Sequence, residues 1–240
     1  MLEQKANSMS FILDILFPKK CVGCRRRGGY FCQDCVYSIM QKDLICPGCE
    51  RVSVGGKTHP KCIGKYGLDG LWSLGAYQGR LKLAIKALKY KFLKQLGNIL
   101  VNVTLDYWVR HEPYFLEEIE KNKDQKWIVT SVPLYWLREN KRGFNQSSLI
   151  GKQLAQKLGL KYLETLKKVK YTKSQVELDE DQRKENIKNA FQIKPNYELR
   201  TMDYVLLVDD VWTTGSTLKE CCYVLKRAGA KKVWALTLAR

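Results

Sequence analysis

Residues 205–217 read VLLVDDVWTTGST. The apolar run at the start of this stretch is typical of a strand buried in the middle of a parallel sheet. We expect the strand to stop at Asp209 and Asp210, so both carboxylates and the following loop lie at the carboxyl edge of the sheet. Open α/β sheets bind ligands at this edge. The stretch therefore predicts an α/β fold with a ligand site after this strand.

The loop after the two acids is small and rich in hydroxyl groups. Residues 218–227 follow it with helical spacing, so the loop opens a helix N-terminus, which attracts phosphate. Carboxylates beside it can accept hydrogen bonds from vicinal ribose hydroxyls. The acids and the loop together therefore predict a sugar phosphate site. The alternative is an acidic turn before an ordinary capped helix. The candidate residues are Val208, Asp209, Asp210, Thr213, Thr214, Gly215, Ser216 and Thr217.

An acid pair followed within a few residues by T-T-G-S-T resembles the signature of the phosphoribosyltransferases. The resemblance implies a type I phosphoribosyltransferase-like parallel sheet that binds phosphoribosyl pyrophosphate (PRPP) with Mg²⁺. It also implies that Asp209 and Asp210 are the catalytic acids, which hold the ribose hydroxyls, and that residues 213–217 hold the 5′-phosphate. Purine salvage relatives usually carry an acid where this chain has Thr213, so the acceptor is left open.

A second candidate strand ends at a cluster of cations. Residues 127–133 (WIVTSVP) are expected to form the first strand of the parallel core, which the proline ends. The loop beyond it carries Arg138, Lys141 and Arg142, and a helix is expected over residues 147–158. Cations at this edge suit a leaving pyrophosphate or a phosphodiester backbone. Upstream, residues 70–78 indicate a strand, residues 81–96 an amphipathic helix with a lysine stripe, and residues 99–119 one or two further helices.

Seven cysteines and a histidine near the N-terminus are spaced in pairs. A C-x-x-C turn points both sulfurs at one ion, and four ligands close a structural zinc site. The turns at residues 21–24 and 46–49 are each followed by a second pair, which favours sequential pairing over an interleaved cross-brace. Two zinc ions are predicted, although His59 and Cys62 can also be a loop histidine and a lone thiol. The ligand sets are Cys21, Cys24, Cys32 and Cys35, then Cys46, Cys49, His59 and Cys62.

Other cysteines and the overall charge give broader expectations. Cys221 and Cys222 fit a helical apolar pattern and are expected to pack in the core. The 42 Lys and Arg residues against 24 acids give a formal charge of +18, spread along the chain. Such a surface favours nucleic acid, pyrophosphate or anionic lipid, and the alternative is a solvated lysine-rich surface. We expect a cytoplasmic protein, because the short apolar stretch at 11–17 contains Asp14 and lacks a cleavage site.

The order of several motifs narrows the resemblance to the ComF family of competence-associated, phosphoribosyltransferase-like proteins. These motifs are the paired cysteines, V-P at a strand end, R-G-F-N-Q at residues 142–146, a stretch from Gln175 to Phe191, and V-D-D-V-x-T-T-G-S-T. Similarity runs over roughly residues 11–240. It implies a zinc-ribbon-like module at residues 1–66 and a phosphoribosyltransferase-like domain at 67–240. His59 stands where most members have a cysteine, and histidine is an equivalent ligand.

The family resemblance implies a role in natural transformation, with single-stranded DNA, a competence helicase of the ComFA type and peripheral membrane contact as candidate partners. Two alternatives stay open. The chain can be a non-catalytic module that binds nucleotide or single-stranded DNA, since aromatic residues such as Tyr135, Trp136 and Tyr90 stand among its cations. It can also transfer phosphoribose to an unidentified acceptor outside competence.

Overall fold

Strand β6 (Tyr204–Val211) lies at the centre of a five-stranded sheet in which every neighbouring pair is parallel. The computed structural model describes residues 18–90, 94–111, 114–121, 126–172, 180–195 and 204–240. The strand order is β1-β7-β6-β2-β3. The other strands are β1 (Gly70–Gly75), β7 (Lys232–Ala239), β2 (Trp127–Ser131) and β3 (Lys161–Tyr162).

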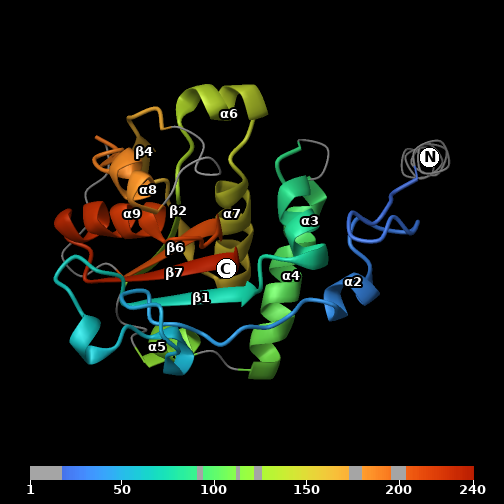
Figure 1. The fold of residues 1–240 in the computed structure, drawn as a ribbon, viewed down its shortest axis with the longest axis horizontal. Helices are drawn as coiled ribbons and strands as arrows, with labels where there is room; N and C mark the ends of the chain where they lie inside the picture. Colours follow the sequence, from blue (N-terminus) through green and yellow to red (C-terminus); the bar gives the residue numbers. More distant parts are fainter. Residues whose placement is uncertain (1–17, 91–93, 112–113, 122–125, 173–179, 196–203) are drawn as a thin grey trace.

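Side chains alternate between two apolar layers, as the pleat of a strand requires. On β6, Leu206 and Val208 pack with helices α3 (Gly79–Ala87), α4 (Lys94–His111) and α7 (Gln146–Leu158). Val205 and Leu207 pack on the other face with α8 (Glu180–Ile187) and α9 (Ser216–Arg227). Figure 1 shows α3 and α4 on the opposite side of the molecule from α8 and α9. Both faces of β6 are covered, which explains its unbroken apolar run.

Smaller elements complete the fold around the sheet. Strands β4 (Leu166–Lys168) and β5 (Phe191–Ile193) pair antiparallel in a separate two-stranded sheet. Helix α6 (Trp136–Arg142) follows β2 and lies at the top of Figure 1. Helix α5 (Tyr114–Lys121) contributes the buried ring of Phe115, which packs against those of Trp72 and Trp108. No helix in the described ranges is long and apolar enough to span a bilayer.

The cysteine-rich segment runs along the β1 edge of the sheet. Helix α2 (Gln33–Tyr37) lies beside α3, and Cys21 and Cys35 are buried in the same apolar layer as α3. Beyond α2 the chain passes to the opposite end of β1 (Figure 1), where short 3₁₀ turns cover Val54–Gly56 and Pro60–Cys62. Lys57 then pairs with Gly70 at the start of β1. The segment is thus joined to the core at both ends, and a boundary at residues 66/67 stays a prediction.

Several sequence-based expectations are corrected by the structure. Residues 127–133 do not form the first strand of the parallel core, because β1 precedes them and pairs in parallel with β7. Strand β6 does not stop at the acids: it runs on to Val211, since β7 continues beside it to Ala239. The expected loop at 134–146 contains α6. The single helix expected over 81–96 is divided, with α3 ending at Ala87 and α4 starting at Lys94.

Other expectations agree with the structure or fall outside it. Cys221 and Cys222 are fully buried on α9, as predicted. The apolar stretch at 11–17 and the part of the third family motif at 175–178 lie outside the described residues.

Candidate functional site

The acid pair lies at the point of the sheet where the chain changes direction. From β2 the chain leads through α7 to β3 at one edge, while from β6 it leads through α9 to β7 on the other side. Because α7 and α9 cover opposite faces, a crevice opens between the carboxyl ends of β2 and β6. Open α/β sheets bind ligands at such a switch point. Asp209 and Asp210 are near the carboxyl end of β6, at this crevice.

A cavity of about 400 Å³ opens here, within the size range of small-molecule sites. It brings together most of the residues predicted for the sugar phosphate and the pyrophosphate: Asp209, Asp210, Thr213, Gly215, Ser216, Thr217, Arg138 and Arg142. Three predicted residues do not line it. Val208 is buried in the sheet, Thr214 faces a neighbouring cavity, and Lys141 is exposed on α6.

The loop at residues 213–217, predicted to bind phosphate and called the phosphate loop below, depends on a glycine. Gly215 caps α9 with a φ of +68°, the left-handed region that glycine adopts without strain. A Cβ atom built on Gly215 would lie 2.2 Å from the Trp212 ring, so a larger residue has no room. The hydroxyls of Thr214 and Ser216 are 2.8 Å apart beside it. The first N–H groups of α9 lack partners within the helix, and the positive end of its dipole faces the cavity.

Cations from two elements face the acids across the cavity. Arg138 and Arg142 come from α6, and Lys168 comes from β4. Thr172 orients two of them, since Nη2 of Arg138 donates to its carbonyl at 2.7 Å and Nζ of Lys168 donates to its hydroxyl at 2.8 Å. Burial lowers the pKa of Lys168 to about 8, with the charge of Arg138 adding to the effect. Three cations at one wall suit a ligand with several negative charges.

The acids themselves are held by the start of α7. Ser147 Oγ donates to Asp209 Oδ1 at 2.9 Å, and Gln146 Nε2 donates to Asp210 Oδ2 at 3.1 Å. Burial and the charge of Asp210 together raise the pKa of Asp209 to about 7, against the opposing effect of the Ser147 hydrogen bond. The Asp209 carboxyl is therefore protonated more easily than an exposed aspartate.

Sequence reasoning missed several residues of the cavity. Tyr77 and Lys89 reach it from the region after β1 and from the end of α3, and Lys168 and Thr172 reach it from the segment around β4. The R-G-F-N-Q motif was noted, but Gln146 and Ser147 were not predicted to contact the acids. The run of polar residues at the start of the helix that follows α6 was the available signal, because buried polar groups need partners.

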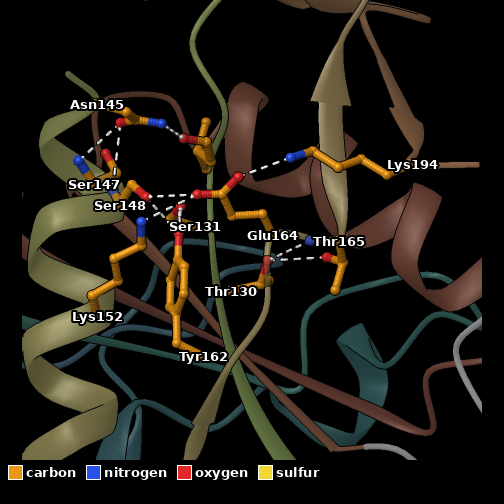
Figure 2. Close-up of polar contacts among 11 residues, drawn as sticks. Thr130, Ser131, Asn145, Ser147, Ser148, Lys152, Tyr162, Glu164, Thr165 and Lys194 are labelled. Atoms are coloured by element: carbon orange, nitrogen blue, oxygen red, sulfur yellow. Dashed lines mark hydrogen bonds and ion pairs between the residues drawn. The ribbon is translucent and has the colours of Figure 1, made fainter. Parts of the chain in front are cut away.

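A smaller cavity of about 190 Å³ adjoins the first and shares Pro133, Leu134 and Lys168 with it. Figure 2 shows its polar wall, where Glu164 forms ion pairs with lysine side chains on two sides. Lys194 Nζ lies 2.8 Å from Glu164 Oε2, and Lys152 Nζ lies 3.4 Å from Oε1. Through Glu164, these ion pairs join α7 to the region after β5.

The eight predicted metal ligands come together in the two sequential sets. Within each set, the ligand atoms all lie within 4.8 Å of one another. Four ligands at ~2.3 Å around one zinc ion are about 3.8 Å apart, so both sets fit a tetrahedral ion. In the first set Cys21 Sγ is 3.4 Å from Cys35 Sγ, and in the second Cys49 Sγ is 3.4 Å from His59 Nδ1. Both groups can hold a metal ion of the zinc type.

The two cysteine turns repeat each other in the backbone. Cys21 N–H donates to Arg26 O at 2.8 Å, and Cys46 N–H donates to Arg51 O at 2.9 Å. Arg25 and Glu50, at equivalent places, both have positive φ values, 63° and 59°. The internal repeat predicted from the cysteine spacing is therefore a structural repeat.

One side chain links the second ligand set to the phosphate loop. Lys219 on α9 lies 3.3 Å from Glu50 Oε1 and donates to Thr214 O at 3.3 Å. Glu50 directly follows Cys49. The segment that carries the second ligand set thus contacts α9, which follows the phosphate loop. A cavity of about 460 Å³ lies between this segment and α9 and is lined by Cys62, Thr214 and Ser216.

The sheet order, the switch-point cavity and the acid pair define a type I phosphoribosyltransferase-like α/β protein. A family profile described as "Phosphoribosyl transferase domain" matches residues 145–240. Over 212 residues the chain is 31% identical to the "DNA utilization protein YhgH" of Salmonella typhi. The aligned region covers 85% of this chain and 88% of that protein.

Two further relatives match shorter parts. The "Competence protein F" of Haemophilus influenzae is 39% identical over 113 residues, 47% of this chain and 49% of that protein. The "Competence protein ComFC" of Streptococcus pneumoniae is 30% identical over 127 residues, 53% of each. The chain belongs to the ComF family.

Proposed function

We propose that the chain binds PRPP with Mg²⁺ in the switch-point cavity and that it acts in natural transformation, in the uptake and internalisation of DNA. One observation carries the proposal for the ligand. A single cavity is lined by two acids, a glycine-capped helix N-terminus and four cations, Lys89, Arg138, Arg142 and Lys168, and these groups match the ribose diol, the 5′-phosphate and the pyrophosphate. The role in transformation rests on the names of the relatives, two of which are competence proteins.

In this proposal, acidic and basic residues bind different parts of PRPP. Asp209 and Asp210 accept hydrogen bonds from the ribose hydroxyls, and the backbone N–H groups of residues 213–217 hold the 5′-phosphate. Arg138, Arg142 and Lys168 stabilise the pyrophosphate, while the exposed Lys141 is left out of this set. When bound, Mg²⁺ would neutralise part of the negative charge of the pyrophosphate. The side chains contribute placement and electrostatic stabilisation of a transition state that resembles an oxocarbenium ion.

Release of pyrophosphate separates an enzyme from a binding module. Wild-type protein would be incubated with PRPP, Mg²⁺ and a panel of candidate acceptors, with Asp210→Ala as the inactive control. Pyrophosphate released by the wild type and not by the variant supports phosphoribosyl transfer. Saturable PRPP binding without release under any condition supports the binding module.

A second candidate function, binding of single-stranded nucleic acid, is favoured by a basic groove. The groove has a volume of about 720 Å³ and lies between the first cysteine turn and α3. Its cations are Lys20, Arg25, Lys86 and Lys89, and in the described part of the chain no carboxylate lines it. Tyr90, 58% exposed, offers a ring for base stacking. Lys89 also lines the switch-point cavity, so this one side chain borders both sites.

We expect single-stranded DNA to bind this groove with little sequence preference. Four or five phosphate contacts give a slope of log K against log salt near −3, at about −0.7 per contact. Lys86→Ala should make this slope less steep by about 0.7. Fluorescence anisotropy of a labelled oligonucleotide across a salt series measures both quantities.

Lys82→Ala is the matched control, because Lys82 is exposed on the same helix one turn away and does not line the groove. Arg142→Ala tests whether the strand also enters the cavity. Absence of binding at low salt would remove nucleic acid from the account, and equal slopes for the wild type and Lys86→Ala would place the contact elsewhere.

A further inference from the structure

The first residues of α7 contact both acids and one of the cations. The Ser147 hydroxyl donates to Asp209 Oδ1 at 2.9 Å, and the Gln146 amide donates to Asp210 Oδ2 at 3.1 Å. The Arg142 guanidinium donates to the same Gln146 side chain through its Oε1 atom. One oxygen of each carboxylate therefore accepts a hydrogen bond from α7, and Asp209 Oδ1 also accepts one from the Asp210 N–H at 2.9 Å. The chain of contacts runs from the cation wall through Gln146 to the acid pair.

These contacts are fixed by the cap of α7. Asn145 Oδ1 accepts hydrogen bonds from the N–H groups of Ser147 and Ser148, at 3.0 and 3.4 Å. Its Nδ2 donates to Val132 O at 2.9 Å, which ties the cap to the end of β2. Figure 2 shows these bonds around Asn145, and shows Ser148 turned to Tyr162, whose hydroxyl is 2.7 Å away. The two serines therefore serve different neighbours.

We propose that Ser147 and Gln146 are positioning residues for the proposed ribose site: they hold one oxygen of each acid and leave the other oxygen to accept a ribose hydroxyl. The proposal rests on PRPP being the ligand. A carboxylate with one oxygen held by a donor is fixed in rotation, so its second oxygen keeps one direction. Hydrogen bonds to the ionised form also favour that form over the protonated one.

The charges around Asp209 set the sign of the effect. Asp210 follows it on β6, Lys168 faces it from β4 and Cys221 faces it from α9, while α7 contributes the uncharged Ser147. Burial and the charge of Asp210 raise the pKa of Asp209, while the Ser147 hydrogen bond, the Asp210 N–H and Lys168 lower it, with a net value of about 7. Removing the Ser147 hydroxyl must therefore raise the pKa of Asp209 further. The protonated acid is a poorer acceptor for the diol. As the pH falls, the variant should therefore lose PRPP binding at a higher pH than the wild type does.

The test compares Ser147→Ala with Ser148→Ala, a substitution at the adjacent buried serine of the same helix turn. PRPP affinity would be measured with Mg²⁺ from pH 6 to pH 9. For Ser147→Ala we expect a midpoint of the pH profile about one unit higher, which weakens binding about fivefold at pH 7 and about tenfold at pH 6. Gln146→Ala is expected to weaken binding about tenfold, through Asp210. The pH profile of PRPP affinity in Ser148→Ala should match that of the wild type. Ionisation of PRPP itself affects all the variants equally, so it cancels in the comparison.

A second measurement separates this proposal from the proposed function. Carbon NMR of the Asp209 carboxyl gives its pKa without any ligand, and we expect a higher value in Ser147→Ala than in the wild type and in Ser148→Ala. If the wild type does not bind PRPP but this difference is found, the ligand is wrong and the positioning role stands. Equal pKa values in Ser147→Ala and Ser148→Ala, or equal PRPP affinities across the pH range, would overturn the positioning role.

Discussion

Asp210→Ala is expected to bind PRPP at least tenfold more weakly than the wild type in the presence of Mg²⁺. Each lost hydrogen bond to a charged group costs about 1.5–3 kcal/mol, which corresponds to about ten- to a hundredfold in affinity. Asp209→Ala should have a comparable effect at pH 8 and a smaller one at pH 6. The reason is that the raised pKa of Asp209, about 7, leaves the wild-type acid mostly protonated at the lower pH. Isothermal titration calorimetry measures both variants.

Glu139→Gln is the control for loss of one negative charge. Glu139 is exposed on α6 and does not line the cavity. The affinity of Glu139→Gln for PRPP should match that of the wild type. Unchanged affinity in both aspartate variants would mean that the acid pair is a structural turn and that PRPP, if bound, is held elsewhere.

Cys21→Ser and Cys46→Ser are each expected to lower the zinc content from two ions per chain to one. Structural zinc in small peptides supplies about 10 kcal/mol or more of apparent binding free energy, which is comparable with the ~5–15 kcal/mol stability of a whole domain. Loss of one ion should therefore unfold the turn around it. Inductively coupled plasma analysis gives the metal content, and the midpoint of thermal unfolding gives the stability.

The two variants should differ in their wider effects. Cys21 is buried in the apolar layer with α3, so Cys21→Ser should lower the unfolding midpoint of the whole chain. The Cys46 set reaches the phosphate loop through Glu50 and Lys219, so Cys46→Ser should also weaken PRPP binding. Cys221→Ala, at a buried cysteine outside both sets, should keep two ions. One ion in the wild type would exclude the set that contains His59.

Much of the site was predictable because its signals are local. The apolar run at 205–208 predicted a central strand, and the acids and hydroxyl-rich loop after it predicted the cavity wall. The cysteine spacing predicted both ligand sets, because a C-x-x-C turn fixes two sulfurs together whatever surrounds it. The exact end of β6 was not predictable, because Val211 is held in the strand by its distant partner Ala239.

The missed residues depend on contacts between distant segments. Lys168 reaches the cavity from a short strand in the two-stranded sheet, and nothing in the sequence around it indicates that sheet. Ser147 and Ser148 are adjacent and chemically identical, yet only Ser147 contacts an acid. Which serine does so depends on where Asn145 caps α7, relative to the end of β2. Sequence alone identifies the polar helix start and not the partner of each side chain.

The central claim is that one cavity holds both the ribose phosphate and the pyrophosphate, and calorimetric titration of the wild type with three ligands tests it directly. PRPP, ribose 5-phosphate and inorganic pyrophosphate would each be titrated with Mg²⁺ at pH 8. The account predicts one PRPP per chain, bound more tightly than either smaller ligand, because only PRPP engages the phosphate loop, the acid pair and the cation wall together. Absence of PRPP binding, or PRPP binding no tighter than that of pyrophosphate alone, would contradict it.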